Sequence, residues 1–377
     1  MRIAQVSPLY ESVPPKNYGG TERIVSYLTE ELVAQGHEVT LFASGDSRTK
    51  ARLISPCPRS FRSNGNSPDS MAYSLLLLEQ VFRQANDFDL IHFHIDCLHF
   101  SFCRREPCRQ LTTLHGRLDL PHQPPLFREY AGMPVVSISD SQRQPLPDLN
   151  WQGTVYHGLP KNLHTFRPNP GDYLAFLGRI CPEKGLDRAI KVAERFGMKI
   201  KVAAKIDDAD SEYYESKIKP MMNRPDVEFL GEIGGKAKDD FLGRAYALLF
   251  PIDWPEPFGL VMIEAMACGT PVIAWPRGSV PEVMENGVTG YIVSNIAGAV
   301  SALEKVAHLN RKGCRDVFER RFSVARMVQD YLRIYQRLQE SDCRNQEISR
   351  EKAVIPLSAD VLPLRKLSSR DVRLQTV

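Results

Sequence analysis

The sequence Pro255-Glu256-Pro257-Phe258-Gly259-Leu260-Val261-Met262-Ile263-Glu264 places two carboxylates eight positions apart. The prolines on either side of Glu256 restrict the backbone, so this side chain is predicted to lie in a stiff loop. The apolar run at 260–267 predicts a buried helix that ends near Gly269. Backbone amides at a helix start are unpaired and carry the positive end of the helix dipole. This pattern favours a ligand that has both phosphate and hydroxyl groups.

Strand and helix patterns alternate on both sides of this motif, which predicts an α/β protein with two doubly wound parallel sheets. Strands are expected at 3–7, 39–43, 90–94, 111–114 and 134–138, and then at 173–177, 200–204, 227–230, 247–250, 272–274 and 291–293. Prolines and glycines cluster between residues 157 and 171, which predicts a linker between two domains. A final amphipathic helix is expected at 322–338.

Composition narrows the class of protein. The 377 residues suit two domains of ordinary size, and a net charge of +3 is too small to indicate a nucleic-acid partner. No apolar run approaches the roughly 18 residues of a membrane-spanning helix. The N-terminus has a strand pattern rather than that of a signal peptide. Eight scattered cysteines without a C-x-x-C pair predict reduced thiols in a cytoplasmic protein.

Two further turns have the composition of phosphate-binding segments. Arg179 and Lys184 lie in a turn that follows one strand and opens a helix, and a planar guanidinium with a compact ammonium suits a diphosphate. A solvated basic turn is the alternative for that segment alone. Gly19 and Gly20 follow the first strand and allow the backbone to approach a ligand closely. The full G-x-G-x-x-G pattern is absent there, which argues against a nicotinamide-type site.

Histidines and small residues mark other strand ends. His115 comes directly after an expected strand in the first half of the chain. In open α/β sheets, ligands gather at the carboxyl ends of the strands. His92, His94 and Asp96 could ligate a metal, but no spacing of cysteines or carboxylates completes such a site. The turn at 277–282 is expected to expose amides toward the cleft, or to be an ordinary strand-to-helix turn.

Taken together, these motifs resemble the retaining glycosyltransferases of family four, which have the GT-B fold, and the resemblance covers roughly residues 1 to 338. It is carried by five motifs in the order typical of the family: Gly19-Gly20, Thr113-Leu114-His115-Gly116, Arg179 with Lys184, Glu256 with Glu264, and Ala265-Met266-Ala267-Cys268-Gly269-Thr270-Pro271-Val272-Ile273-Ala274.

The resemblance implies a role for each matching residue. Arg179 and Lys184 would neutralise the donor diphosphate, while amides around Phe258, Gly259 and Leu260 would contact the phosphates and the sugar. Glu256 would hold sugar hydroxyls and Glu264 the ribose hydroxyls. Three other segments complete the implied site: Gly20 would close over the phosphates, Ile233 lies in the segment that receives the base, and His115 would lie beside the transferred sugar.

The resemblance also implies the reaction: transfer of a hexose, with retention, from a nucleotide-sugar such as UDP-glucose. No metal or other cofactor is expected, because Arg179 and Lys184 replace a divalent ion and no D-x-D triplet lies beside the site. The acidic clusters 207–210 and 239–240 are expected to be solvated surfaces. Two departures from the family pattern are His157, where an asparagine is usual, and Lys205, a candidate further cation.

The resemblance sets the domain boundaries as well. Residues 1–165 would form the acceptor-side domain and 166–321 the donor domain. A crossover helix at 322–340 would return to the first domain, and 341–377 would be an extended or partly disordered tail. The acceptor, whether a glycan, a lipid-linked sugar or a small molecule, would meet loops at 10–18, 55–69 and 117–130.

Three questions stay open from the sequence. The basic group Arg104, Arg105 and Arg109 is compatible with peripheral contact to a membrane or with a solvated helix face. The alternatives to a transferase are another GT-B enzyme, such as a nucleotide-sugar epimerase or a phosphorylase, and a catalytically silent nucleotide-sugar-binding or scaffold protein. The oligomeric state cannot be read from the sequence.

Overall fold

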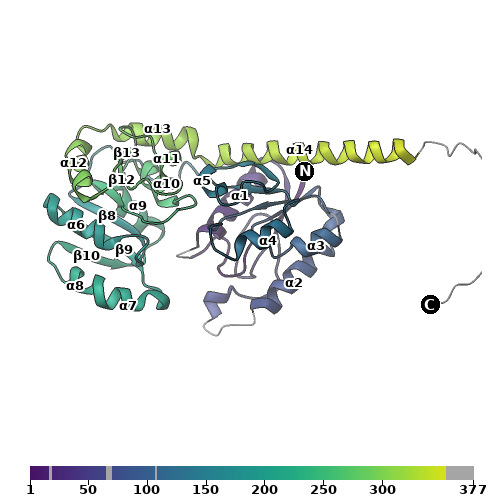
Figure 1. Ribbon diagram of the computed structural model, residues 1–377, viewed down its shortest axis with the longest axis horizontal. Coiled ribbons are helices and arrows are strands. Elements are labelled where there is room, and N and C mark those ends of the chain that lie inside the picture. The colour runs from purple at the N-terminus through teal and green to yellow at the C-terminus, as the bar shows by residue number, and fades with distance from the viewer. Residues whose placement is uncertain (17–18, 65–69, 107, 354–377) are drawn as a thin grey trace, which may run out of the picture. The chain divides into compact units, whose positions relative to one another are not determined.

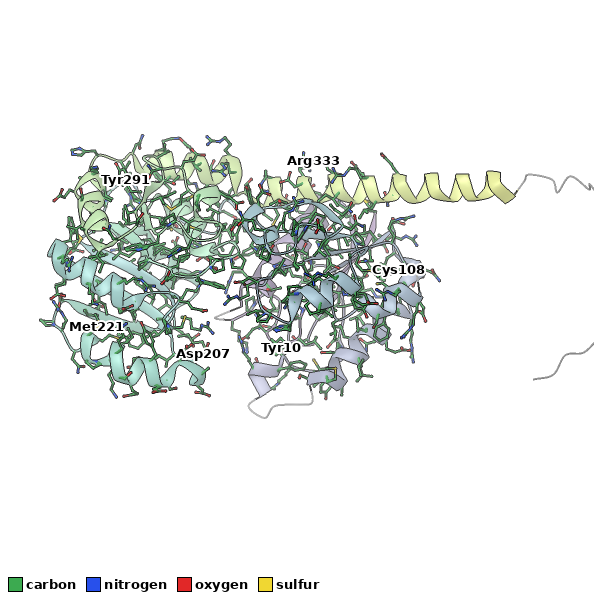
Figure 2. All side chains as sticks on the ribbon, viewed as in Figure 1. Tyr10, Cys108, Asp207, Met221, Tyr291 and Arg333 are labelled. Atoms are coloured by element: carbon green, nitrogen blue, oxygen red, sulfur yellow. The ribbon has the colours of Figure 1, made fainter. Side chains whose placement is uncertain are left out.

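Two parallel sheets, each flanked by helices, form the body of the protein in a computed structural model that describes residues 1–16, 19–64, 70–106 and 108–353 (Figure 1). The chain divides into two compact units, residues 1–336 and 337–377, and both sheets belong to the first. Side chains fill the space around both sheets, with Tyr10 and Cys108 labelled in the first half and Asp207, Met221 and Tyr291 in the second (Figure 2).

The first sheet has seven parallel strands in the order β3-β2-β1-β4-β5-β6-β7. Its strands are β1 (Arg2–Val6), β2 (Glu38–Phe42), β3 (Arg52–Ile54), β4 (Leu90–Phe93), β5 (Gln110–Thr113), β6 (Val135–Ser137) and β7 (Trp151–Thr154). Its helices are α1 (Gly20–Ala34), α2 (Ser70–Phe82), α3 (Phe100–Arg105), α4 (Gln123–Glu129) and α5 (Asp140–Arg143), with short 3-10 turns at Phe61–Asn64 and Ala85–Asp87.

The second sheet has six parallel strands in the order β10-β9-β8-β11-β12-β13. They are β8 (Tyr173–Arg179), β9 (Lys199–Lys205), β10 (Val227–Gly231), β11 (Ala247–Phe250), β12 (Val272–Ala274) and β13 (Gly290–Ile292). The helices are α6 (Leu186–Phe196), α7 (Ser211–Tyr213), α8 (Lys219–Met222), α9 (Gly235–Gly243), α10 (Leu260–Cys268), α11 (Val280–Val283), α12 (Ile296–Val306) and α13 (Arg311–Arg321), with a 3-10 turn at Asp208–Asp210 and a π turn at Tyr214–Ile218.

Continuous apolar runs explain why these strands lie at the centre of their halves. All four residues of β11 are buried, as expected for a parallel strand that is covered on both faces. Helix α6 is amphipathic and buries one face, which packs against α12. The strands were predicted to within a few residues, except for β3 and β7, which are short and only partly buried.

Helix α14 (Val324–Ala353) connects the second sheet back to the first half. Tyr331 and Tyr335 on this helix are completely buried, and they bond to Thr113 and His92, which belong to the first sheet. The linker runs beside the start of the helix, where the Leu159 amide donates to the Phe322 carbonyl at 2.9 Å. The predicted boundary at residue 165 lies between the two sheets.

The prediction of an extended tail from residue 341 is wrong for residues 341–353, because α14 continues to Ala353. This segment includes glutamine, glutamate, arginine, lysine and alanine, which favour helix, and it contains no glycine or proline. The next proline is Pro356, and a helix usually ends before such a residue. The rest of the predicted tail, 354–377, lies outside the described residues.

Candidate donor and acceptor site

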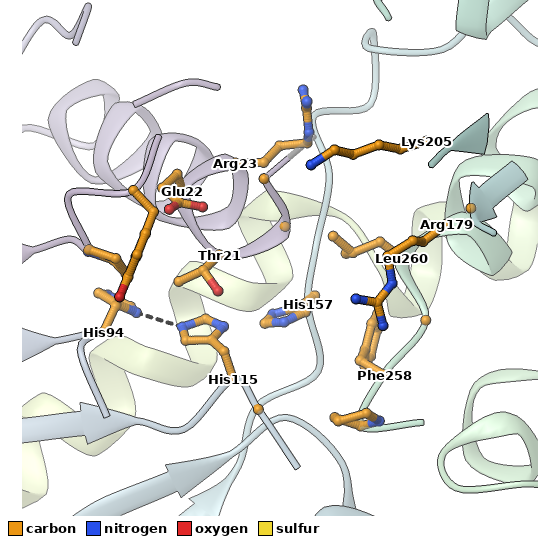
Figure 3. Close-up of a pocket in the computed structure, with 18 of the residues that line it drawn as sticks. Thr21, Glu22, Arg23, His94, His115, His157, Arg179, Lys205, Phe258 and Leu260 are labelled. Atoms are coloured by element: carbon orange, nitrogen blue, oxygen red, sulfur yellow. Dashed lines mark hydrogen bonds between the residues drawn. The ribbon is translucent and has the colours of Figure 1, made fainter. Parts of the chain in front are cut away.

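A cavity of about 820 Å³ lies at the carboxyl ends of strands from both sheets. Parallel sheets gather ligands at this edge because the turns into the following helices meet there. Every residue that the sequence proposed for the site lines this cavity: Gly19, Gly20, His115, Arg179, Lys184, Lys205, Ile233, Glu256, Phe258, Gly259, Leu260 and Glu264. Figure 3 shows part of this lining.

The start of helix α10 forms one side of the cavity. Gly259 precedes the helix with φ 77°, and a Cβ atom there would lie 2.8 Å from the Met262 Cε. Glycine is therefore required for the sharp entry into the helix. Phe258, Gly259 and Leu260 all line the cavity, so the helix begins at the cavity wall, and amides at the start of a helix lack partners within the helix. The second glutamate of the motif follows one turn later on the same helix.

The turn at 277–282 supports the Glu256 loop and does not line the cavity, so the expectation that its amides face the cleft is wrong. The Ser279 amide donates to the Glu256 carbonyl at 2.9 Å. A Cβ on Gly278 would lie 2.3 Å from the Glu256 backbone, so the two segments touch. This close approach leaves no room for a ligand between them.

Glu256 is buried and has two partners in the cavity wall. The Lys184 ammonium donates to Glu256 Oε2, and the Trp254 indole donates to the same oxygen at 2.9 Å. The Lys184 ammonium also lies over the Trp254 ring, 4.7 Å from its centroid. The proposed phosphate-binding lysine and the proposed sugar-binding glutamate are thus held together, which fixes both rotamers.

Glu264 is the second carboxylate of the motif, and a lysine that sequence reasoning missed neutralises it. The Lys238 ammonium donates to Glu264 Oε1 at 2.5 Å, and both line the cavity. Burial raises the pKa of Glu264, but Lys238, His164 and Arg23 outweigh it, so the net pKa is lowered. Glu264 is therefore an anion that accepts hydrogen bonds. Lys238 lies in helix α9, outside every motif quoted above.

Arg179 and Lys205 end neighbouring strands β8 and β9, and both side chains meet Asp207. The Lys205 ammonium lies 2.6 Å from Asp207, and the Arg179 guanidinium lies 3.5 Å from Asp207 and 3.8 Å from Asp210. The prediction that the acidic cluster 207–210 is a solvated surface is therefore wrong for Asp207 and Asp210, which pair with these cations. Burial raises the pKa of Asp207, but the two cations outweigh it and keep the pKa low.

The prediction of a solvated surface is also wrong for Asp239. This side chain is buried and accepts hydrogen bonds from the Thr165 amide at 2.8 Å and from His164. Within the described ranges, His164, Asp239 and Cys268 bring metal-ligand atoms within 4.8 Å of one another. They lie outside the cavity lining, and their own hydrogen bonds account for the arrangement.

His115 faces the cavity from the end of strand β5, with two further histidines beside it. His94 Nδ1 lies 2.9 Å from His115 Nε2, and the His157 ring stacks on His115 with centroids 5.3 Å apart (Figure 3). Burial lowers the pKa of His115 to about 3 and places those of His94 and His157 well below the usual value. All three rings are neutral at physiological pH.

The hypothesis of a metal bound by His92 and His94 does not match their contacts. Both rings are buried, and each ring nitrogen has a hydrogen-bond partner within the protein. His157 was noted only as a departure from the family pattern, yet it lines the cavity and contacts Phe258. Its position immediately before the linker glycine was the one signal that could have identified it.

The side of the cavity that is formed by residues before the linker, called here the first-half wall, contains two carboxylates that were not proposed as site residues. The side formed by residues after the linker is the second-half wall. Glu22 is buried in the first turn of α1, where burial raises its pKa (Figure 3). Asp96 has a left-handed backbone with φ 50°, a conformation that is uncommon outside glycine and frequent at functional sites. Both line the cavity. Glu22 lies two positions after Gly20 of the glycine turn, which was the available signal.

Of the loops expected to meet the acceptor, four residues line the cavity: Tyr10, Phe61, Arg62 and Arg117. Residues 17–18 and 65–69 of those loops lie outside the described residues. Met71 on α2 also lines the cavity, and Tyr10 and Met71 are 54% and 59% exposed. Tyr10 and Met71 therefore give the first-half side of the cavity exposed apolar surface beside the charged Arg62 and Arg117.

Two arginines of the basic group, Arg104 and Arg109, are engaged within the protein. Arg104 pairs with Glu129 at 2.6 Å and stacks on the Tyr130 ring, while Arg109 donates to the Asp89 carbonyl at 2.9 Å. Within the described ranges, every helix is too short or too polar to cross a membrane. None of the cysteines with described side chains forms a disulfide.

Comparison with known families identifies the chain. Residues 165–315 match the model described as "Glycosyl transferases group 1", and residues 18–135 match "Glycosyltransferase Family 4". The chain belongs to glycosyltransferase family 4. The two matches divide as the two sheets do, and the enzyme has the GT-B fold.

One relative by sequence agrees with this assignment, and two solved structures have the same fold. An uncharacterised glycosyltransferase of Methanocaldococcus jannaschii is 25% identical over 334 residues, 77% of this enzyme and 84% of the relative. The sucrose-phosphate synthase structure from Thermosynechococcus elongatus has a TM-score of 0.73 at 18% identity and covers 90% of this enzyme and all of that chain. The Anabaena protein HepE, in complex with UDP-glucose, has a TM-score of 0.68 at 17% identity, with 90% and 100% covered.

Proposed function

We propose that this glycosyltransferase transfers a hexose from a nucleotide-sugar, UDP-glucose or a close relative, with retention of configuration and without a metal ion. One observation carries the proposal: Arg179, Lys184 and the start of α10 all face the same cavity. Negative charge develops on the leaving diphosphate during glycosyl transfer. Fixed cations and helix amides stabilise such charge without reorganising.

The second-half wall supports distinct contacts for each part of the donor. Arg179 and Lys205 end adjacent strands and would hold the diphosphate together with Lys184. Glu264, held as an anion by Lys238, would accept bonds from the ribose hydroxyls. Ile233 lies at the end of the same wall, after strand β10, and would contact the base. Glu256 would accept bonds from the sugar hydroxyls.

Metal independence is proposed from the pairing of the carboxylates on this wall. Glu256 is bonded to Lys184, Glu264 to Lys238, and Asp207 to Lys205. A carboxylate that is already neutralised by a lysine is a poor ligand for a divalent cation, because its lone pairs face a positive charge. The cations themselves supply the charge that a metal ion would supply.

A UDP-sugar donor is further supported by the Anabaena protein of the same fold, which was solved with UDP-glucose. The first-half wall supports an acceptor site, because Tyr10, Glu22 and Met71 line the cavity beyond His115. An epimerase acts on its donor alone and has no use for such a wall. This feature and membership of a glycosyltransferase family favour the transferase over the epimerase and over a silent binding protein.

The test is nucleotide release from UDP-, GDP- and ADP-sugars by the purified enzyme, with and without EDTA. We expect slow release from a UDP-hexose that EDTA does not change. The anomeric configuration of the released or transferred sugar, read by NMR, should match that of the donor. Release that stops with EDTA and returns with a divalent ion would contradict the metal-free part. An inverted product would contradict retention.

A further inference from the structure

A row of buried polar side chains extends behind His115, away from the cavity. His94 Nδ1 bonds His115 Nε2 at 2.9 Å, and His94 Nε2 bonds the Gln5 carbonyl oxygen Oε1 at 2.9 Å. The Gln5 amide nitrogen then donates to the Tyr335 hydroxyl at 3.4 Å. Gln5 and Tyr335 are completely buried and His94 is 2% exposed. The row thus joins the first strand of the protein, the cavity and the crossover helix.

The same helix holds a second branch of the row. The Tyr335 hydroxyl bonds His92 Nδ1 at 2.7 Å, and His92 Nε2 bonds Thr113 Oγ1 at 2.8 Å. Thr113 in turn bonds the Tyr331 hydroxyl at 2.9 Å. Both tyrosines of α14 therefore end in polar contacts inside the first half. Burying a polar atom is unfavourable unless it is hydrogen-bonded. If α14 only packed against the first sheet through apolar contacts, it would not need these two hydroxyl groups.

The direction of each hydrogen bond follows from the amide of Gln5. A carbonyl oxygen only accepts, so His94 Nε2 must carry the proton of that ring. A neutral imidazole carries one proton, so His94 Nδ1 is an acceptor. His115 Nε2 must then be the donor of the bond between the two rings. The remaining nitrogen of His115, Nδ1, is left with a lone pair, and it lies on the side of the ring away from His94 (Figure 3).

We propose that Gln5 and His94 are positioning residues that hold His115 in the tautomer protonated at Nε2, with Nδ1 presented as an acceptor for a hydroxyl group of the donor sugar. This inference rests on the proposed function for the identity of that hydroxyl. Tyr335 fixes the required orientation of the Gln5 amide from the crossover helix: its hydroxyl donates to His92 Nδ1 and is then left to accept from the Gln5 amide nitrogen. The opposite orientation of that amide would reverse every bond in the row and present a donor at Nδ1 instead.

Stacking of His157 on His115 fits this assignment. The two rings are nearly parallel, with an interplanar angle of 18°, and His157 is 4% exposed. Stacking restrains the plane of the His115 ring, while His94 fixes its rotation within that plane. A residue that touches the sugar needs both restraints, because small errors in position cost large factors in rate.

The experiment reads the tautomer directly. Full-length enzyme with ¹⁵N-labelled histidine is studied by long-range ¹H–¹⁵N correlation, and His115 is assigned by its loss in His115→Asn. We expect wild-type His115 to be protonated at Nε2, and Gln5→Leu to give a mixture of tautomers. Donor turnover by Gln5→Leu should fall about 10-fold, as is typical when a supporting hydrogen bond is removed. Its Kd for UDP alone should be unchanged.

Gln110→Leu is the matched control, because Gln110 is also a buried glutamine on a strand of the first sheet but lies outside the row. It should leave both the tautomer and turnover near wild type. If Gln5→Leu does not fold, Tyr335→Phe removes a single oxygen and should shift the tautomer in the same direction with a smaller loss of turnover.

A wild-type His115 protonated at Nδ1 would overturn the proposal, as would equal losses of turnover in Gln5→Leu and Gln110→Leu with the tautomer unchanged. The NMR measurement needs no donor. Failure of the proposed function would appear as no turnover of any nucleotide-sugar with the tautomer as expected. Failure of this inference would appear as turnover of a nucleotide-sugar by an enzyme whose His115 is protonated at Nδ1.

Discussion

The two walls of the cavity differ in how their polar groups are neutralised. On the second-half wall, lysines and an arginine pair with carboxylates: Lys184 with Glu256, Lys238 with Glu264, and Arg179 with Asp207. On the first-half wall, which also contains the carboxylates Glu22 and Asp96, neutral histidines bond to one another, to an amide and to hydroxyls. The first arrangement suits an anionic leaving group, and the second suits a neutral sugar that must be oriented.

The largest effect is expected on the charged wall. Lys184→Ala should lower donor turnover by about 100- to 1,000-fold, the range found when one stabiliser of developing charge is removed. Glu256 also loses its ionic partner in that variant. Lys191→Ala is the control, because this exposed lysine lies on α6 of the same half. Near-wild-type rates for Lys184→Ala, measured as UDP released, would remove the proposed phosphate role.

Glu264→Gln should weaken UDP binding by about 10- to 100-fold, because a charged acceptor for the ribose hydroxyls becomes neutral. Lys238 is left without its anion at the same time. Isothermal titration with UDP measures the change. Binding of inorganic pyrophosphate, which has no ribose, should change far less. An equal loss for both ligands would place Glu264 at the phosphates instead.

The buried histidines of the first half make the protein sensitive to acid. His99 and His115 have folded-state pKa values of about 3, because burial disfavours their charged forms. The unfolded chain binds protons below a pKa near 6.5 and the folded chain does not, so stability is full above that pH and falls as the pH decreases toward 3. Each such histidine costs about 1.4 kcal/mol per pH unit in this window.

Denaturant unfolding between pH 7.5 and 4.5 measures this loss. His99 lies outside the cavity lining. His99→Gln should therefore lower the pH dependence of the free energy of unfolding by the contribution of one histidine, about 1.4 kcal/mol per pH unit, without changing UDP binding. A pH-independent free energy of unfolding over this range would contradict the assignment of neutral, buried histidines.

The smallest effect is expected at Asp207. Asp207→Asn removes a negative charge that competes with the diphosphate for Arg179 and Lys205, while Arg179 keeps Asp210 as a partner. UDP should bind about two- to five-fold more tightly, in line with the strength of partly exposed ion pairs, and the gain should shrink at high salt. Weaker binding would show that Asp207 positions the cations more than it neutralises them.

The two walls also differ in how far the sequence could predict them. Arg179, Lys184, Glu256 and Glu264 lie in short motifs after strands, and strand ends in a parallel sheet meet at one edge. The alternation of strands and helices placed these motifs at one edge of the sheet, and the resemblance to family four implied their roles. His115 was found by the same rule on the first half.

Other residues could not be predicted from the sequence, because their roles depend on contacts between distant parts of the chain. Gln5 and Tyr335 are 330 positions apart and meet only because α14 returns to the first sheet. Lys238 belongs to a helix without any recognisable motif, and its role follows from its 2.5 Å contact with Glu264. The buried state of Asp239 was likewise hidden, since acidic residues on a helix usually face solvent.

A crystal structure of the enzyme with an unreactive UDP-sugar analogue tests the division of work between the two walls most directly. The account predicts that the diphosphate contacts Arg179, Lys184 and the amides at the start of α10, with no metal ion bridging it, and that His115 Nδ1 accepts a bond from a sugar hydroxyl. A diphosphate held through a metal ion, or a sugar bound away from His115, would contradict it.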